Sequence, residues 1–384
     1  MKILFMVFHF PPISGGGVVV IVELANKLAE LGHEITILTP ELEWNNKKYE
    51  PIINENILIH KIPTPSNSNL KIAARRCYDN MRKRGIELGK INEYDFILTI
   101  FHPFHLVPKA AVSCGKELKK PVIIKIDDAI YQKSTGIKNL QRKIEKIYNS
   151  KTLQNGDKIL VMNEYTKELV NDYYKVPKEK ISIVSNGTNL EKFYSKNKKK
   201  NRIVFSGAMY HHRGIDVLLE SVPDVLKKIT NVEFLLLGDG PEMKKLQEIV
   251  REKNLSKNVI FKGWVNREEI PEFLATSKIG IGPLRKTDVT KGALPIKVLE
   301  YMGSSLPILA LKDTLPEDVL ENSVNGYQIN NSKDLSGKII HLLEHEELRN
   351  KMGQKSRSMA KKYDWENIAK SVILEYKSVI SSLQ

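Results

Sequence analysis

The stretch RIVFSGAMYHHRGIDVLLE, residues 202–220, contains a short apolar run, a glycine-bearing loop and the start of an amphipathic segment. The uninterrupted apolar residues at 203–205 are typical of a strand that is covered on both faces. Arg213–Gly214 then leads into apolar residues at helical spacing. The same succession recurs along almost the whole chain, and repeated strand–helix units predict parallel sheets in an α/β fold.

The predicted strands form two series. They are 2–10, 34–39, 57–62, 95–101, 121–127, 158–163 and 181–185 in the first half, and 202–206, 232–237, 258–263, 278–283 and 306–311 in the second. Between the series, SKNKKKN at 195–201 is polar and has no hydrophobic period. We therefore predict a domain over 1–187, a linker over 188–201, a second domain over 202–363 and a C-terminal amphipathic helix over 364–384.

Length and composition agree with a soluble two-domain protein. The chain has 384 residues, 41% of them hydrophobic and 27% charged. No apolar run approaches the roughly 18–20 residues that span a bilayer, and the apolar N-terminus is interpreted as a buried first strand rather than a signal peptide. Two cysteines, Cys77 and Cys114, indicate neither a disulfide framework nor a cysteine metal site. A reducing, cytoplasmic setting is expected.

The chain is basic, with 60 Lys and Arg against 45 Asp and Glu and a net charge of +15. That charge suits nucleic acid, an anionic membrane surface or phosphate-bearing small molecules, and does not choose among them. A nucleic-acid module needs basic residues interleaved with exposed aromatic ones. Here the aromatic residues have mostly core spacing, so we expect no nucleic-acid partner.

Glycines follow several predicted strands. Gly15–Gly17 lie between the first strand and the first helix, without forming a GxGxxG fingerprint, so NAD binding is not supported. Gly207 and Gly238 end strands in the second half. Glycine lets backbone N–H groups approach a phosphate, and a helix N-terminus favours negative charge. A phosphate site and an ordinary tight turn both explain these positions.

The stretch KGALPIKVLEYMGSSLPILA, residues 291–310, is the most informative one for chemistry. Pro295 opens a helix on which Lys297 and Glu300, three residues apart, share a face. The lysine and the free N–H groups suit a diphosphate, and the carboxylate suits ribose hydroxyls. Arg213 could bind a diphosphate bidentately. A surface Lys–Glu pair and an exposed arginine are the alternatives.

These motifs, in this order, resemble glycosyltransferase family 4. The resemblance runs through FHFPPISGGG, LAELGHEITILT, SNGTNLEKF, FSGAMYHHRGIDVLLES, LLLGDGP, VIFKGWV, PIKVLEYMGSSLPILA, NGYQI and YDWENIAK. It implies the GT-B fold, in which two Rossmann-like domains face each other across a cleft and the C-terminal helix crosses back to the N-terminal domain. It also implies a retaining enzyme that uses a UDP-, GDP- or ADP-linked sugar and needs neither a cofactor nor a metal.

The resemblance also implies roles for individual residues. Arg213 falls where relatives have a phosphate-binding lysine, Glu300 matches the second glutamate of the E-x7-E motif, and Val265 falls where the backbone contacts the base. The donor site that follows comprises Gly16, Gly17, Gly207, Gly238, Val265, Pro295, Ile296 and Glu300. Arg213, Lys297 and the helix N-terminus would stabilise the leaving diphosphate.

The chain departs from the family pattern at positions that the resemblance assigns to the sugar and to the diphosphate. Gly292 replaces the first glutamate of E-x7-E, Ala208 stands where an arginine is frequent, and Asp127–Asp128 replace a His–Asp pair. The P-x-K-x-x-E-Y-M pattern resembles a sub-branch with the same glutamate loss, in which Lys297 compensates. Asp127 is then the candidate acceptor for a sugar hydroxyl. An unusual donor sugar, a catalytically weak homologue and a GT-B nucleotide-sugar epimerase are the alternatives.

Segment 70–90 is an amphipathic helix with basic residues around its polar face. Because the resemblance places this region on the acceptor side, we hypothesise that it docks on an anionic membrane, at the cytoplasmic face, and presents a lipid-linked or polysaccharide acceptor. A solvated basic helix is the alternative.

Overall fold

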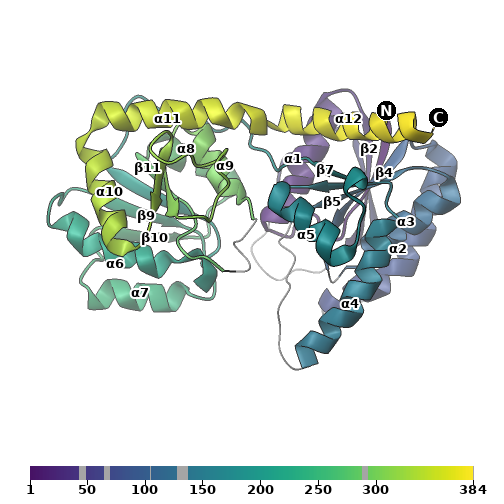
Figure 1. Ribbon diagram of the computed structural model, residues 1–384, viewed down its shortest axis with the longest axis horizontal. Coiled ribbons are helices and arrows are strands. Elements are labelled where there is room, and N and C mark those ends of the chain that lie inside the picture. The colour runs from purple at the N-terminus through teal and green to yellow at the C-terminus, as the bar shows by residue number, and fades with distance from the viewer. Residues whose placement is uncertain (43–48, 65–69, 104, 128–136, 288–292, 384) are drawn as a thin grey trace. The chain divides into compact units, whose positions relative to one another are not determined.

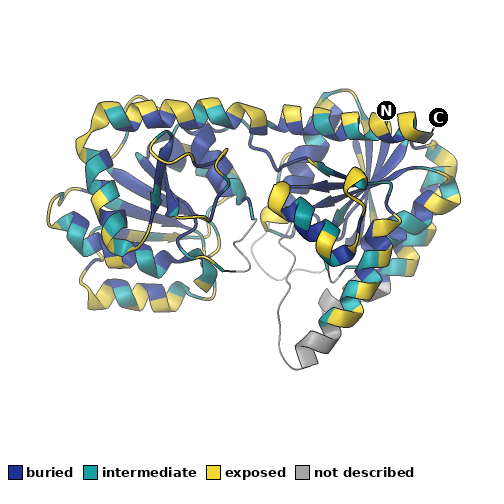
Figure 2. Ribbon diagram, viewed as in Figure 1, coloured by how far each residue is buried: buried dark blue, intermediate teal, exposed yellow. Residues whose placement is uncertain are grey.

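The computed structural model describes residues 1–42, 49–64, 70–103, 105–127, 137–287 and 293–383 (Figure 1). The chain divides into two compact units. The first comprises Met1–Asn186 together with Trp365–Gln384, and the second comprises Gly187–Asp364. In each unit the strands of a central sheet are largely buried and the flanking helices expose one face, as Figure 2 shows.

The first unit is built on a seven-stranded parallel sheet with the order β3-β2-β1-β4-β5-β6-β7. Its strands are β1 (Lys2–Met6), β2 (Glu34–Glu41), β3 (Ile57–Pro63), β4 (Phe96–Phe101), β5 (Val122–Ile126), β6 (Lys158–Val161) and β7 (Ile181–Ile183). Its helices are α1 (Gly16–Glu30), α2 (Leu70–Asn92), α3 (Val107–Leu118), α4 (Ile137–Gln154), α5 (Glu164–Tyr174), η1 (Lys178–Lys180) and α12 (Trp365–Leu383). The strand order reverses between β1 and β4.

The second unit repeats this plan with a six-stranded parallel sheet of order β10-β9-β8-β11-β12-β13. The strands are β8 (Arg202–Ser206), β9 (Glu233–Leu237), β10 (Val259–Gly263), β11 (Ile279–Ile281), β12 (Ile308–Leu311) and β13 (Gly326–Ile329). The helices are η2 (His211–Arg213), α6 (Ile215–Leu226), α7 (Met243–Glu252), η3 (Arg267–Glu269), α8 (Ile270–Ala275), α9 (Ile296–Gly303), α10 (Ser332–Glu344), α11 (Glu346–Ala360) and η4 (Lys361–Tyr363). Here the reversal lies between β8 and β11. In doubly wound sheets, ligands bind beyond the carboxyl ends of the strands at such a point.

The C-terminal helix α12 belongs to the first unit, as the resemblance implies. The Tyr376 ring stacks on Phe96 of β4 at a centroid distance of 4.6 Å. The Glu375 carboxylate lies 3.1 Å from the Lys158 ammonium and accepts a hydrogen bond from the Ser182 hydroxyl at 2.9 Å. Trp365 at the start of the helix is 1% exposed. The C-terminal helix therefore packs as part of the first unit.

The structure differs from the predicted linker over 188–201, because this segment packs on the second unit. Lys196 N donates to Ala275 O at 3.2 Å and Lys200 N donates to Thr276 O at 2.8 Å. The Arg357 guanidinium donates to the carbonyls of Leu190, Phe193 and Gly303. Polar side chains that face solvent, on a backbone that is hydrogen-bonded to the domain, explain why the segment resembles a linker in sequence. The change of unit comes earlier, at Asn186–Gly187.

Candidate active site

Two glycine turns meet at the carboxyl ends of β8 and β9. Gly207 N donates to Leu237 O at 2.8 Å, and Gly238 N donates to Gly263 O at 2.7 Å. Both residues have a positive φ, +124° at Gly207 and +130° at Gly238. A Cβ at Gly238 would lie 2.1 Å from Gly207 O, so no side chain fits there. The close approach of the two turns therefore requires glycine at 238, whether or not a ligand binds.

Lys297 lies beside this turn on α9. The helix follows Pro295, which is extended, and begins at Ile296. Lys297 is 8% exposed, and its Nζ lies 3.6 Å from the centroid of the Phe205 ring and 3.6 Å from the place of a Cβ on Gly207. Among the described residues, Nζ has no hydrogen-bond partner. A buried ammonium next to glycine backbone is an arrangement that an anion would stabilise.

Arg213 adds a second cation to the same edge. It ends η2, directly before Gly214, whose φ of +70° turns the chain into α6. Its carbonyl accepts from Leu284 N at 3.2 Å. The pKa of Lys297 is held well below its usual value by burial first and by the positive charge of Arg213 second, while the Glu300 carboxylate acts in the opposite direction. Arg213 and Lys297 therefore repel each other in the absence of an anion.

Glu300 is paired with Arg267, which no sequence pattern connects to it. Arg267 Nη2 lies 2.7 Å from Glu300 Oε1, although the N–H bonds do not point along a hydrogen bond. The glutamate is 2% exposed. Arg267 opens η3, where Asn266 and Glu269 form a capping box just after Val265. That N-x-x-E capping signal is visible in the sequence, but the contact with Glu300 is not.

The remaining second-unit predictions have different outcomes. Tyr301 is buried, and its hydroxyl accepts from Ser206 N at 2.7 Å, which ties α9 to the end of β8. Val265 is half-buried, and the neighbouring Trp264 is 38% exposed. Ala208 is exposed. Gly292 lies outside the described residues. The predicted donor-binding residues Gly207, Gly238 and Glu300 and the predicted catalytic residue Lys297 thus lie at the carboxyl edge of one sheet.

In the first unit, α1 begins at Gly16 after Gly15, whose φ is +155°. A Cβ built on Gly15 or Gly17 meets no described atom within 4 Å. Packing therefore does not demand glycine at 17.

Asp127 follows β5 and is paired with a buried lysine two residues earlier. Lys125 is 0% exposed, and its Nζ contacts Asp127 Oδ1 and donates to Asn186 Oδ1 at 2.8 Å. The sequence pattern indicates Asp127 but neither Lys125 nor Asn186. The neighbouring Asp128 lies outside the described residues.

Three histidines gather near the reversal of strand order in the first unit. His9 follows β1, and His102 and His105 follow β4. The ring centroids of His102 and His105 are 4.1 Å apart, and those of His9 and His105 are 4.8 Å apart. Burial, with a smaller contribution from His102 at His9, lowers the pKa of His9 and of His102 to about 4, and lowers that of His105 further. The cluster is therefore uncharged near neutral pH.

The predicted membrane-docking helix is present as α2, but the side chains of 70–76 lie outside the described part. Farther along, Cys77 and Met81 are buried. Arg82 pairs with Glu117 at 3.1 Å and Arg84 pairs with Glu87 at 3.0 Å. These two arginines thus already have acidic partners. Among the described helices, none is long and apolar enough to cross a membrane.

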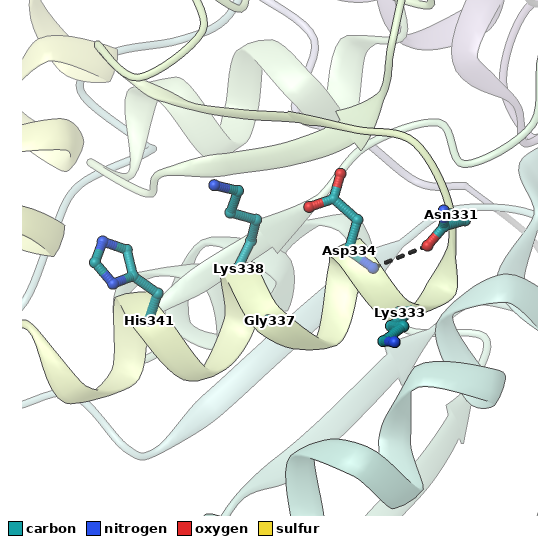
Figure 3. Close-up of a pocket in the computed structure, with 6 residues that line it drawn as sticks. All are labelled: Asn331, Lys333, Asp334, Gly337, Lys338 and His341. Atoms are coloured by element: carbon teal, nitrogen blue, oxygen red, sulfur yellow. Dashed lines mark hydrogen bonds between the residues drawn. The ribbon is translucent and has the colours of Figure 1, made fainter.

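A separate hollow of ≈ 410 Å³ lies along α10 (Figure 3), lined by Asn331, Lys333, Asp334, Gly337, Lys338 and His341. Asn331 Oδ1 accepts from Asp334 N at 2.9 Å, and the Lys338 ammonium lies 4.3 Å above the Tyr327 ring. Asn331 therefore caps α10 and Lys338 packs on β13. None of the predicted donor-binding residues lines this hollow. Within the described ranges, no group of three or more His, Cys, Asp or Glu is placed to hold a metal ion.

Comparison with known proteins identifies the family of the chain. The family model for Glycosyltransferase Family 4 matches residues 14–192, and the model for Glycosyl transferases group 1 matches residues 187–359. The chain belongs to glycosyltransferase family 4. The two matches meet where the chain passes from the first unit to the second.

Relatives of this glycosyltransferase match over nearly its whole length. An uncharacterized glycosyltransferase of Methanocaldococcus jannaschii is 26% identical and is covered over 99% of both chains. The alpha-monoglucosyldiacylglycerol synthase of Acholeplasma laidlawii is 21% identical over 96% of this chain and 95% of the relative. An Anabaena protein solved in complex with UDP and glucose superposes with a TM-score of 0.74 at 13% identity, over 98% of this chain and 100% of that one. This likeness shows the fold, which is GT-B. The glycosyltransferase is thus an enzyme that transfers sugars.

Proposed function

We propose that this glycosyltransferase is a retaining enzyme that takes its sugar from a nucleoside-diphosphate sugar. The observation that carries the proposal is Lys297, a buried ammonium with no hydrogen-bond partner among the described residues, close to Gly207 and Arg213. A diphosphate would supply the missing negative charge. The Anabaena neighbour solved with UDP and glucose supports a UDP-linked donor.

The proposed mechanism needs no covalent intermediate on a side chain. The bond between the anomeric carbon and the diphosphate oxygen breaks, and the acceptor oxygen forms its bond on the same face of the sugar. The leaving phosphate oxygen takes the acceptor's proton. Lys297, Arg213 and the N-terminus of α9 at Pro295–Ile296 stabilise the charge that develops on the diphosphate. Gly16 and Gly17 leave room for the donor phosphates.

The nucleoside is proposed to bind along the edge that carries Glu300 and Val265. The Glu300 carboxylate accepts hydrogen bonds from the ribose hydroxyls, and Arg267 keeps it oriented through the 2.7 Å ion pair. Backbone groups at Gly238 and Val265 face the base and the ribose. Because Glu300, Arg267, Gly238 and Val265 all belong to the second unit, the nucleoside part of the donor is proposed to bind there.

The proposed acceptor is a hydroxyl of a glycan, a lipid-linked saccharide or a polysaccharide. The Acholeplasma relative, whose name denotes a glucosyl lipid product, supports a lipid acceptor. Docking of 70–90 on the cytoplasmic face of an anionic membrane remains part of the proposal. Co-sedimentation with phosphatidylglycerol vesicles tests it, and binding that is equal with neutral phosphatidylcholine vesicles contradicts it.

A thermal-shift screen with UDP, GDP, ADP and their glucose or mannose conjugates tests the donor proposal. We expect one nucleotide to stabilise the wild-type enzyme and Glu300→Ala to weaken that shift. Glu347→Ala, which changes an exposed glutamate on α11, is the matched control. The absence of a shift with every nucleotide contradicts the proposal.

Product analysis distinguishes the alternatives. NMR of the product should show the donor's anomeric configuration retained, whereas an epimerase would return a nucleotide-linked epimer, and a catalytically weak homologue would bind without turnover. Transfer that persists in EDTA is expected if no metal or other cofactor is needed. Transfer that EDTA abolishes and Mg²⁺ restores contradicts that part.

A further inference from the structure

Lys125 is unusual because it is a fully buried lysine in the middle of a parallel sheet. It lies in β5, paired with Ile100 of β4 on one side and with Leu160 of β6 on the other. Its four strand neighbours Val122, Ile123, Ile124 and Ile126 are buried and apolar. An ammonium in such surroundings is costly unless it is paired and hydrogen-bonded.

The ammonium is held by two oxygens. One is Asp127 Oδ1, two residues farther along the chain and just past the end of β5. The other is Asn186 Oδ1, at 2.8 Å. The orientation of that amide is itself set, because Asn186 Nδ2 donates to Met162 Sδ at 3.5 Å. The lysine thus fixes one oxygen of Asp127 in place.

The second oxygen of Asp127 is not used in this way. The carboxylate side chain is only 7% exposed, and Oδ2 is buried with no hydrogen-bond partner among the described residues. A pair that served only the stability of the core would be expected to satisfy both oxygens. Oδ2 instead lies beyond the carboxyl end of a central strand, where ligands of doubly wound sheets bind.

The charges indicate what kind of group Oδ2 would take. The Lys125 ammonium already balances the Asp127 carboxylate, so the pair has no net charge. A metal ion or another cation would add an uncompensated positive charge to a buried site. A neutral O–H donor adds none and completes the carboxylate's hydrogen bonds.

We propose that Lys125, together with Asn186, is a positioning residue that holds Asp127 so that Oδ2 accepts a hydrogen bond from a sugar hydroxyl. This inference rests on the proposed function. The hydroxyl comes either from the transferred sugar or from the acceptor, and the experiment below distinguishes the two sources.

The decisive variant is the double substitution Lys125→Met with Asp127→Asn, which removes both charges together. Lys125→Met alone leaves the Asp127 carboxylate without a counter-ion, and Asp127→Asn alone leaves the Lys125 ammonium without one. We expect each single substitution to lower the melting temperature. The double variant should recover most of that loss. The matched control is Lys178→Met with Glu168→Gln, which removes an exposed ion pair of the same unit. Lys125→Arg tests whether the charge alone suffices.

The donor arm measures dissociation constants of UDP and UDP-glucose, and of GDP and GDP-mannose, by calorimetry. If the hydroxyl belongs to the transferred sugar, the double variant binds the sugar nucleotide about tenfold or more weakly and binds the free nucleotide as the wild type does. The acceptor arm measures nucleotide release with and without glucose or glycerol as a soluble acceptor. If the hydroxyl belongs to the acceptor, only the acceptor-stimulated rate falls, by a similar factor.

A double variant that folds and matches the wild type in both arms overturns the inference and leaves the proposed function standing. A wild-type protein that binds none of these nucleotides overturns the proposed function, and the inference with it. An effect of equal size in the Lys178–Glu168 control also overturns the inference, because it would show that any lost ion pair in this unit has that effect.

Discussion

Lys297 combines two properties that rarely occur together in a stable protein without a purpose. It is almost completely buried, and its ammonium has no hydrogen-bond partner among the described residues. The Phe205 ring offers a cation–π contact at 3.6 Å, which offsets only part of the lost hydration. A phosphate would change this balance, because it supplies the charge that the protein leaves out.

Replacing Lys297 with methionine should therefore separate stability from binding. We expect Lys297→Met to unfold at the same or a higher temperature, with a gain of about 1 kcal/mol in the free energy of unfolding. Its affinity for the preferred nucleoside diphosphate should fall about tenfold or more. Calorimetry of both properties checks this, with exposed Lys351→Met as the control. Unchanged nucleotide affinity would exclude Lys297 from the donor site.

The lowered pKa of Lys297 also predicts a pH dependence of binding. Burial and Arg213 favour the neutral amine, whereas a bound diphosphate favours the ammonium and raises the pKa again. Binding should therefore take up protons, and the affinity should fall as the pH rises through the pKa of the free enzyme. Calorimetry in buffers of different ionisation enthalpy measures this uptake. Lys297→Met should abolish it, and an uptake that persists in this variant would point to another group.

Gly238 and Gly17 both follow predicted strands, but packing requires glycine only at 238. A Cβ at Gly238 would overlap Gly207 O, whereas a Cβ at Gly17 meets no described atom within 4 Å. We expect Gly238→Ala to lose about 3 kcal/mol or more of stability. Gly17→Ala should stay within about 1 kcal/mol of the wild type and yet lose transfer activity. Chemical denaturation and transfer assays test both, and full activity in Gly17→Ala would assign that glycine to the turn alone.

At the scale of elements, the loops after β1 and β4 bring His9, His102 and His105 together in uncharged form. Their pKa values are lowered in the folded unit, to about 4 for His9 and His102, from an ordinary value of 6.5. The unfolded chain therefore binds more protons between these pH values. The stability that the neutral rings contribute is present above pH 6.5 and is lost as the pH falls towards 4.

The first unit should accordingly lose stability in mild acid. Each of His9 and His102 contributes a slope of about 1.4 kcal/mol per pH unit in this window. His102→Gln should flatten the dependence of the melting temperature on pH, whereas His345→Gln, which changes an exposed histidine of the second unit, should not. Parallel curves for wild type and His102→Gln would show that His102 is not buried in its neutral form.

At the scale of the whole molecule, the chain begins and ends in the same unit. Trp365→Ala, which empties a buried site at the start of α12, should destabilise the first unit by about 3–5 kcal/mol. Leu374→Ala lies on the same helix, where the leucine is 63% exposed, and should change stability by less than about 0.5 kcal/mol. Scanning calorimetry should show that the unfolding transition of the first unit shifts to lower temperature in Trp365→Ala but not in Leu374→Ala. A bound nucleotide should raise the temperature of the second unit's transition. If both transitions shift together in either experiment, the two units do not unfold independently.

Much of the fold is visible in local sequence patterns. Apolar runs such as 203–205 predict buried parallel strands because both faces of these strands are covered, and the ends of those runs place Gly207 and Gly238 at one edge of the sheet. Lys297 and Glu300 share a helix face by their spacing. The short strand β13 and the packed segment 188–201 were not predicted as such, since neither has a distinctive hydrophobic period.

The pairings that define the site come from the tertiary structure alone. Arg267 pairs with Glu300, and Lys125 pairs with Asp127 and donates to Asn186. Three histidines from two loops form one cluster. Periodicity reports only which side of its own element a residue faces. The packing of strands and helices decides which groups from separate elements meet and which buried polar atom has no partner. Ion pairs and hydrogen bonds depend on distance in space, and the sequence separation of two residues does not give that distance.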